Sequence, residues 1–66
     1  MTKEQLHKDV ESRGLVVEAG YDPGNDGDPI FWIEEPESSQ KISPAFFSLP
    51  ELTGWWLRNR GGMSSL

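Results

Sequence analysis

The middle of the chain, GYDPGNDGDPIFWIEE, crowds acidic and amide side chains among glycines and prolines, as calcium-binding loops do. An EF-hand loop needs oxygen ligands at its first, third, fifth and twelfth positions and a glycine at its sixth. With Gly27 at the sixth position, Asp22 and Asp26 fall on ligand positions. Gly24 and Ile33 fall on the other two, and neither has a side-chain oxygen. The stretch also lacks a phosphate-loop motif. We therefore expect a turn between two strands, with no metal and no cofactor.

Groups that could perform catalysis are sparse. His7 is the only histidine and there is no cysteine, so neither a Cys–His pair nor a histidine cluster can form. Glu34 and Glu35 are neighbours on a predicted strand, so their side chains point to opposite faces. Paired-carboxylate catalysis instead requires two acids directed at one substrate. The sequence therefore predicts a protein without enzyme activity.

The residue types enriched in binding hot spots gather near the C-terminus. Trp55 and Trp56 are adjacent on a predicted helix, about 100° apart, so one can enter the core while the other lies at its margin. Arg58 and Arg60 follow closely, and tryptophan with arginine is common where proteins bind one another. The alternative is that both tryptophans cover the sheet. The sequence leaves open which of them is buried.

Acidic residues dominate the middle of the chain. The formal net charge is −5, and residues 14–40 contain no base. An acidic surface of this kind disfavours direct nucleic-acid binding and favours attraction to a basic partner. Solubility alone is the simpler explanation of the charge. The acids in this stretch are Glu18, Asp22, Asp26, Asp28, Glu34, Glu35 and Glu37.

Size limits what the chain can do by itself. With 66 residues and no cysteine, it is expected to bury only about 60% of its unfolded surface and to have no disulfide framework. We expect one domain over residues 1–62 and a frayed tail over residues 63–66. The N-terminus has no apolar signal segment, and no apolar run approaches the length of a membrane span. A cytoplasmic protein is the expectation.

An amphipathic helix is predicted over residues 2–13. Thr2 and Gln5 have the spacing of a capping box. Leu6 and Val10, four residues apart, share one helix face. Gly14 suits the left-handed conformation that often ends a helix.

Strand patterns follow. Residues 15–21 alternate between apolar and other side chains, and residues 30–35 are rich in β-branched and aromatic types, which predicts an antiparallel hairpin. Lys41 and Ile42 are a candidate for a short third strand. A helical turn is predicted over residues 45–49, and a helix over residues 49–60, ended by two glycines. The predicted fold class is α+β, with both helices on one face of a small sheet.

The two faces of this sheet differ in what they offer a partner. The helices can cover only one face, and the richer side of the first strand should meet them. Some aromatic surface of the second strand, around Ile30 and Trp32, is then left near solvent. A sizeable apolar patch usually marks a contact site, so a homodimer is one way to cover it.

Three classes of function are consistent with these patterns. The leading hypothesis is a small non-enzymatic protein that binds another protein, and its composition is typical of phage, prophage and bacterial accessory proteins. The alternatives are a nucleic-acid mimic that blocks a basic groove and a homo-oligomeric structural protein. The candidate partner-binding residues are Trp32, Glu34, Glu35, Trp55, Arg58, Asp26 and Asp28.

Overall fold

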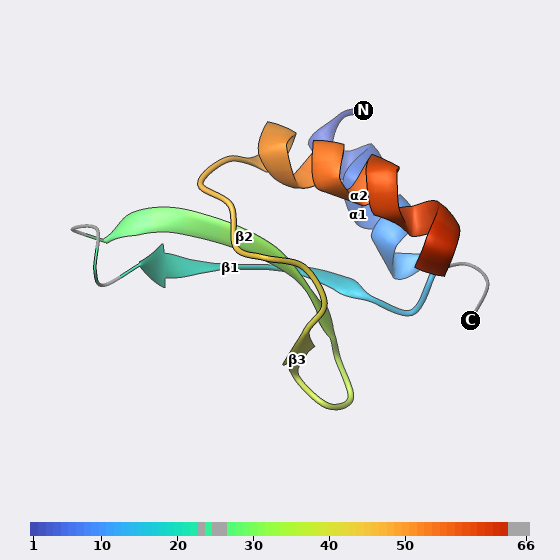
Figure 1. Cartoon of the computed structure of the whole chain (residues 1–66), viewed down its shortest axis with the longest axis horizontal. Coiled ribbons are helices and arrows are strands. Elements are labelled where there is room, and N and C mark those ends of the chain that lie inside the picture. The colour runs from blue at the N-terminus through green and yellow to red at the C-terminus, as the bar shows by residue number, and fades with distance from the viewer. Residues whose placement is uncertain (23, 25–26, 64–66) are drawn as a thin grey trace.

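The computed structural model describes residues 1–22, 24 and 27–63. In chain order the elements are α1 (Lys3–Glu11), β1 (Val16–Asp22), β2 (Asp28–Glu35), β3 (Gln40–Lys41) and α2 (Leu49–Met63). The strands form one antiparallel sheet in the order β1-β2-β3, and both helices lie on the same side of it (Figure 1). The predicted α+β architecture is confirmed. The predicted loop residues Pro23, Asn25 and Asp26, and the predicted tail residues 64–66, lie outside the described residues.

Helix α1 begins with the predicted capping box. The Gln5 N–H donates to Thr2 Oγ1 at 3.2 Å, and the Thr2 N–H donates back to Gln5 Oε1 at 2.8 Å. The helix ends earlier than the sequence predicted, in a turn around left-handed Gly14, whose φ is 77°. There the Gly14 N–H donates to the Glu11 carbonyl at 3.0 Å and the Leu15 N–H to the Val10 carbonyl at 3.2 Å. These two bonds form a Schellman motif, which turns the chain into β1.

Strands β1 and β2 form the predicted hairpin, in a register that pairs Val17 with Ile33 and Ala19 with Phe31. Strand β2 begins before the predicted residue 30 and includes Pro29. Proline fits there because the backbone of Phe31, two residues later, bonds on the side away from β1. The nitrogen of Pro29 faces the same way, so its missing N–H costs no bond between β1 and β2.

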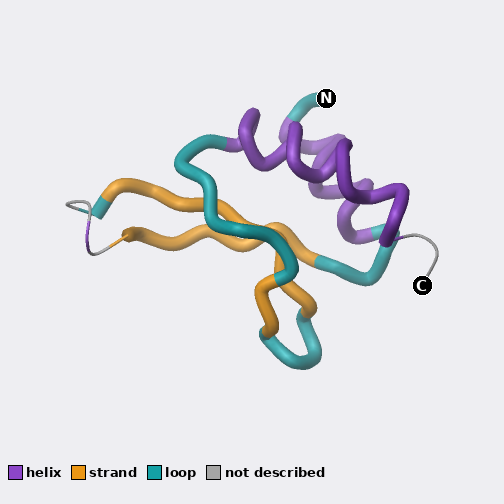
Figure 2. The backbone as a smooth tube through the Cα atoms, viewed as in Figure 1, coloured by secondary structure: helices purple, strands orange, loops and turns teal. Residues whose placement is uncertain are grey.

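The chain after β2 returns along the free edge of that strand. The predicted third strand exists, one residue earlier than expected, as Gln40–Lys41. The loop after it runs back along the sheet before it reaches α2 (Figure 2). The predicted helical turn over residues 45–49 is wrong. Phe46 instead exchanges two backbone hydrogen bonds with Phe31, at 2.7 and 2.8 Å, which holds this segment extended.

Ser43 supplies a hydrogen-bond acceptor at the edge of β2, where this returning segment offers no backbone carbonyl to the Ile33 N–H. The Ile33 N–H donates to Ser43 Oγ at 2.8 Å, and the Ser43 hydroxyl donates to the Pro44 carbonyl at 2.9 Å. Ser43 is buried, so an unpaired Ile33 N–H at this place would be costly. The hydroxyl therefore takes the place of a backbone partner.

Helix α2 starts as predicted, with the Glu51 N–H donating to Ser48 Oγ at 3.4 Å. It ends later than predicted, because Gly61 and Gly62 continue the helix to Met63. Glycine can adopt the left-handed conformation that ends a helix, but it can also remain helical. Arg60, just before Gly61, is held in the helix because its guanidinium donates to Asp9 and its carbonyl accepts from Arg13. Among the described residues, neither helix has the length and apolar character needed to cross a bilayer.

The core lies between the helices and one end of the sheet. Its fully buried side chains come from α1, β2 and α2, and they are Leu6, Val10, Ile33, Leu52 and Trp56. The hairpin continues past this core, so that the end of β1 and the start of β2 lie away from both helices (Figure 1). The described chain is accordingly elongated, with extents of 38 × 27 × 18 Å.

Candidate functional site

The side of the β1–β2 hairpin that faces away from the helices is the candidate functional site, and we call it the outer face. Ile33 is buried under the helices, and Val17 and Phe31 pack against the same core. Because side chains alternate along a strand, the residues between these positions point the other way. Through the register they form cross-strand pairs, which are Val16 with Glu34, Glu18 with Trp32, Gly20 with Ile30 and Asp22 with Asp28.

Trp32 lies at the centre of the outer face and is half-buried. Its ring packs against Gly20, where an added Cβ would come within 3.1 Å of the indole. The Lys41 ammonium lies 4.7 Å from the ring centroid, within the range of a cation–π interaction. The indole Nε1–H donates to Glu34 Oε1 at 3.0 Å. Three contacts therefore hold the tryptophan in one orientation.

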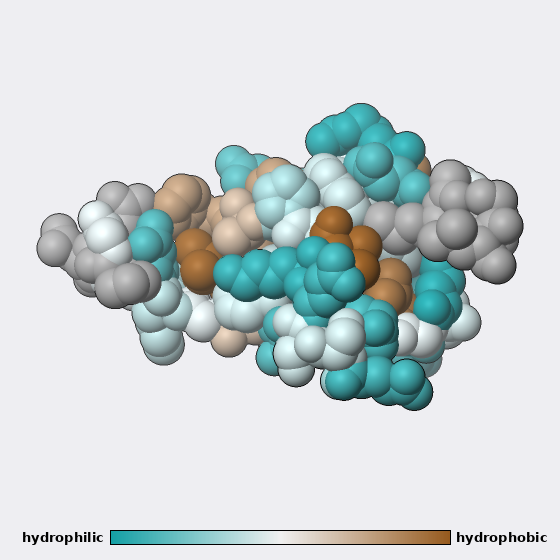
Figure 3. All heavy atoms as spheres, turned by 60° about the horizontal axis from the view of Figure 1, so that its bottom comes forward, coloured by the Kyte–Doolittle hydropathy of each residue, from teal (hydrophilic) through white to brown (hydrophobic). Residues whose placement is uncertain are grey.

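Acidic residues share this face with the tryptophan, with Glu18 and Glu34 next to it and Asp22 and Asp28 further along the hairpin, where the Gly24 N–H donates to Asp22 Oδ1 at 2.9 Å. The register brings four acids of the hairpin to the outer face, namely Glu18, Asp22, Asp28 and Glu34. Lys41 is the one base in the three strands, because the other bases lie on the helices or next to them. Seen from the sheet side, apolar patches are separated by hydrophilic side chains (Figure 3). The acidic segment of the sequence thus becomes an acidic surface, with Lys41 over Trp32 as the base on it.

One of the predicted acidic site residues, Glu35, is not on this face. The Glu35 side chain shapes the turn after β2, where it accepts from the Ser38 hydroxyl at 2.7 Å and from the Glu37 N–H at 2.9 Å. These bonds, the Ser38 hydroxyl first, lower the pKa of the Glu35 carboxyl. Asp26 lies outside the described residues.

The predicted tryptophan and arginine cluster of α2 divides into two roles. Trp56 is fully buried, whereas Trp55 is half-buried against the core. The Trp56 Nε1–H donates to Asp9 Oδ2 at 2.6 Å, and Arg60 Nη1 reaches the same oxygen at 2.6 Å. Arg58 remains exposed. Half of the cluster therefore joins the two helices and is not free to bind a partner.

Asp9 is the residue of this junction that sequence reasoning missed. The Trp56 indole, then the Arg60 guanidinium, lower the pKa of the Asp9 carboxyl. Arg13 completes the junction, because its guanidinium donates to the Arg60 carbonyl at 3.1 Å and lies 5.7 Å from the Trp56 ring centroid. In the sequence Asp9 looks like one more surface acid, and no local pattern reveals partners in a distant helix.

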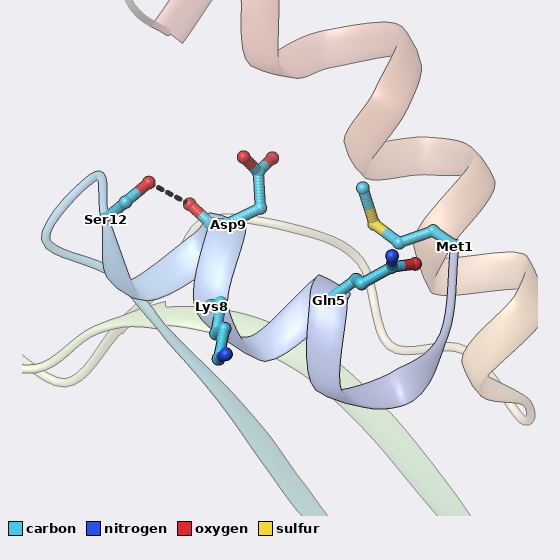
Figure 4. Close-up of a pocket in the computed structure, with 5 residues that line it drawn as sticks. All are labelled: Met1, Gln5, Lys8, Asp9 and Ser12. Carbon is cyan, nitrogen blue, oxygen red and sulfur yellow. Dashed lines mark hydrogen bonds between the residues drawn. The ribbon is translucent and has the colours of Figure 1, made fainter.

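The surface of α1 carries an open hollow lined by Met1, Gln5, Lys8, Asp9 and Ser12 (Figure 4). The Ser12 hydroxyl and the Asp9 carboxylate of this hollow already have partners on the helices. The Ser12 hydroxyl donates to the Asp9 carbonyl at 2.6 Å, and the Asp9 carboxylate points toward α2. His7 lines a different hollow on α1, with Lys3, Glu4 and Lys8. Over residues 1–22, 24 and 27–63, no three His, Cys, Asp or Glu side chains are placed to hold a metal ion.

Comparison with protein-family models, with curated proteins and with solved structures finds no match for this chain. The outer face is therefore interpreted from its own chemistry. It combines a fixed aromatic ring, a row of carboxylates and a position on the projecting hairpin. Trp32, Glu34 and Asp28 of the predicted site residues share this face, while Trp55 and Arg58 lie on α2.

Proposed function

We propose that this chain acts by binding another protein, and that the outer face of the hairpin makes the contact. The observation that carries the proposal is the register, which places four acidic residues on the same face as Trp32, on the side without helices. A large, immobilised aromatic residue is the type that dominates binding energy at protein interfaces. Carboxylates around it add selectivity and speed association with a partner of opposite charge. The partner we propose is a protein with a basic surface.

A second copy of the chain is a poorer match for this face. Each chain has a formal net charge of −5, and joining two outer faces would bring their carboxylates together. Like charges brought face to face cost several kcal/mol by order of magnitude. The sequence-based homodimer through Ile30 and Trp32 is therefore not the function we favour.

Two variants with equal charge test the proposal. The first neutralises the outer face with Glu18→Gln, Asp22→Asn, Asp28→Asn and Glu34→Gln. The control neutralises four exposed acids elsewhere, with Glu4→Gln, Glu11→Gln, Glu37→Gln and Glu51→Gln. Each set changes the formal net charge from −5 to −1. Any difference between the two therefore reports the position of the charge and not its amount.

The measurement is capture of proteins from a lysate of the source cell, at about 50 mM and about 500 mM salt, since salt screens exposed charges. We expect the wild type and the control to retain the same partner at low salt and the outer-face variant to lose it. Retention by the outer-face variant, with loss by the control, would contradict the proposal.

The same row of carboxylates supports nucleic-acid mimicry as a second proposal. A mimic places its acids where a nucleic acid would place phosphates, so both compete for one basic groove. Duplex DNA added to the captured complex should then release the partner. A partner that stays bound in excess DNA fits the first proposal and not the second.

A further inference from the structure

The two sides of the β1–β2 hairpin differ in whether another segment of the protein bonds to them. The edge of β2 that faces away from β1 is covered by β3, by Ser43 and by the bridge between Phe46 and Phe31. Strand β1 lies at the opposite edge of the sheet. Among the described residues, no backbone hydrogen bond joins the outer edge of Val16–Asp22 to another segment. One edge is closed by the protein itself, and the other is left open.

The direction of the backbone groups along this open edge follows from the register. The peptide groups of Phe31 and Ile33 bond on the side of β3, so they make no bonds to β1. Their partners across the sheet, Ala19 and Val17, therefore direct their own N–H and C=O groups outward. Tyr21 follows in the same alternation. Three residues thus present a ladder of unused donors and acceptors.

Strand β1 lacks the lysine, the proline and the bulge that often block an edge, and its charged residues are both acidic. Proteins protect exposed strands with lysine, proline or a bulge. The sequence VVEAGYD contains neither lysine nor proline, and its pairing with β2 is continuous from Val16 to Asp22. At its end Tyr21 is 74% exposed. A partner segment can therefore form hydrogen bonds with the backbone of β1 and pack against the exposed ring of Tyr21.

We propose that the free edge of β1 binds an extended, lysine- or arginine-bearing segment of a partner protein, which adds to the sheet as a fourth strand. This inference rests on the proposed function and names the kind of partner segment. Strand addition supplies affinity through main-chain hydrogen bonds and specificity through alternate side chains. Charge identifies the occupant, because Glu18 and Asp22 flank this edge on the outer face and β1 contains no base.

The register also predicts the pattern of the bound segment. Residues opposite Glu18 and Asp22 are four apart in the added strand, on the outer face, where basic side chains complement the two acids. The residues next to them point to the other face, beside Ala19 and the exposed ring of Tyr21. There apolar side chains are favoured. The expected pattern is a base, an apolar residue, any residue, an apolar residue and a second base.

The probe is a capped synthetic peptide that contains Lys-Val-Thr-Val-Lys, added to the full chain. Hydrogen exchange measured by NMR should slow at the Val17, Ala19 and Tyr21 amides, because these become bonded on binding. A peptide with glutamate in place of lysine should bind at least roughly tenfold more weakly. A peptide with methylated backbone nitrogens on the bonding side should lose affinity to a similar extent.

Ala19 allows a matched pair of protein variants. Ala19→Pro removes one outward N–H without removing a bond to β2, and Ala19→Thr keeps that N–H at the same exposed site. We expect Ala19→Pro to weaken peptide binding by roughly tenfold and Ala19→Thr to bind like the wild type. If Ala19→Pro fails to fold by its melting curve, the methylated peptide provides the same test.

Two outcomes would overturn strand addition. One is the absence of binding at millimolar peptide. The other is binding that leaves the three amides unprotected and the methylated peptide equally tight. Capture from lysate separates this failure from failure of the proposed function. If Ala19→Pro still captures the partner and the outer-face variant does not, strand addition at the edge of β1 is contradicted, and the outer face remains the binding site.

Discussion

Leu52→Ala will unfold much of the protein at room temperature, or lower its melting temperature sharply. Leu52 is fully buried between the helices and the sheet. Truncating a packed leucine costs about 2–5 kcal/mol, from lost burial and the cavity that remains. A domain of this length has a total stability of only about 3–10 kcal/mol, so the substitution removes a large share of it.

Leu57→Ala provides the matched control, because it makes the same chemical change on the same helix. Leu57 is 45% exposed. Its truncation should change the free energy of unfolding by no more than about 0.5 kcal/mol. Thermal melting followed by circular dichroism measures both variants. Equal melting temperatures for the two would mean that the face of α2 assigned to the core is not buried.

Asp9→Ala is expected to have the second largest effect on stability. The substitution leaves the indole N–H of fully buried Trp56 without its acceptor and removes the ion pair with Arg60. An unsatisfied buried donor costs about 1–3 kcal/mol. Asp9→Asn keeps an oxygen in place while removing the charge, so its loss of stability should be smaller. Urea unfolding of the two variants and the wild type measures the difference.

The same residue predicts a dependence on pH. The folded protein lowers the pKa of the Asp9 carboxyl, so the folded state binds this proton less readily than the unfolded state does. The stabilisation is therefore complete above the ordinary aspartate pKa of about 4 and is lost as the pH falls through the lowered value. Asp9→Asn should flatten the acid side of the stability curve. Glu35 remains in both proteins and affects both equally. If the difference in free energy of unfolding between the wild type and Asp9→Asn does not change with pH, the assignment to Asp9 is contradicted.

Local patterns in the sequence were sufficient for most of the fold. The capping box at Thr2, the left-handed Gly14 and the alternation of the two main strands depend on near neighbours, and all are found in the structure. Where the prediction was wrong, a distant contact was the reason. Ala45 to Leu49 has a helix-like signature, but the backbone of Phe46 bonds to Phe31 instead.

The candidate site was predictable in composition but not in geometry. The sequence shows that the acids are concentrated around Trp32, and it separates Glu34 from Glu35 by strand alternation. It does not give the register, which is what brings Glu18 and Asp22 to the same face as Glu34. It also gives no sign that Asp9 binds Trp56 and Arg60, because those residues are 47 and 51 positions away in the sequence.

Site-specific photo-crosslinking tests the binding role of the hairpin most directly. A benzophenone amino acid replaces Ile30 on the outer face of the hairpin in one protein and exposed Leu57 on α2 in a second. Each is irradiated in a lysate of the source cell, and adducts are identified by mass spectrometry. We predict that position 30 forms an adduct with a basic protein and that position 57 does not. Adducts to that protein from position 57 alone would place the interface on α2 and contradict the account.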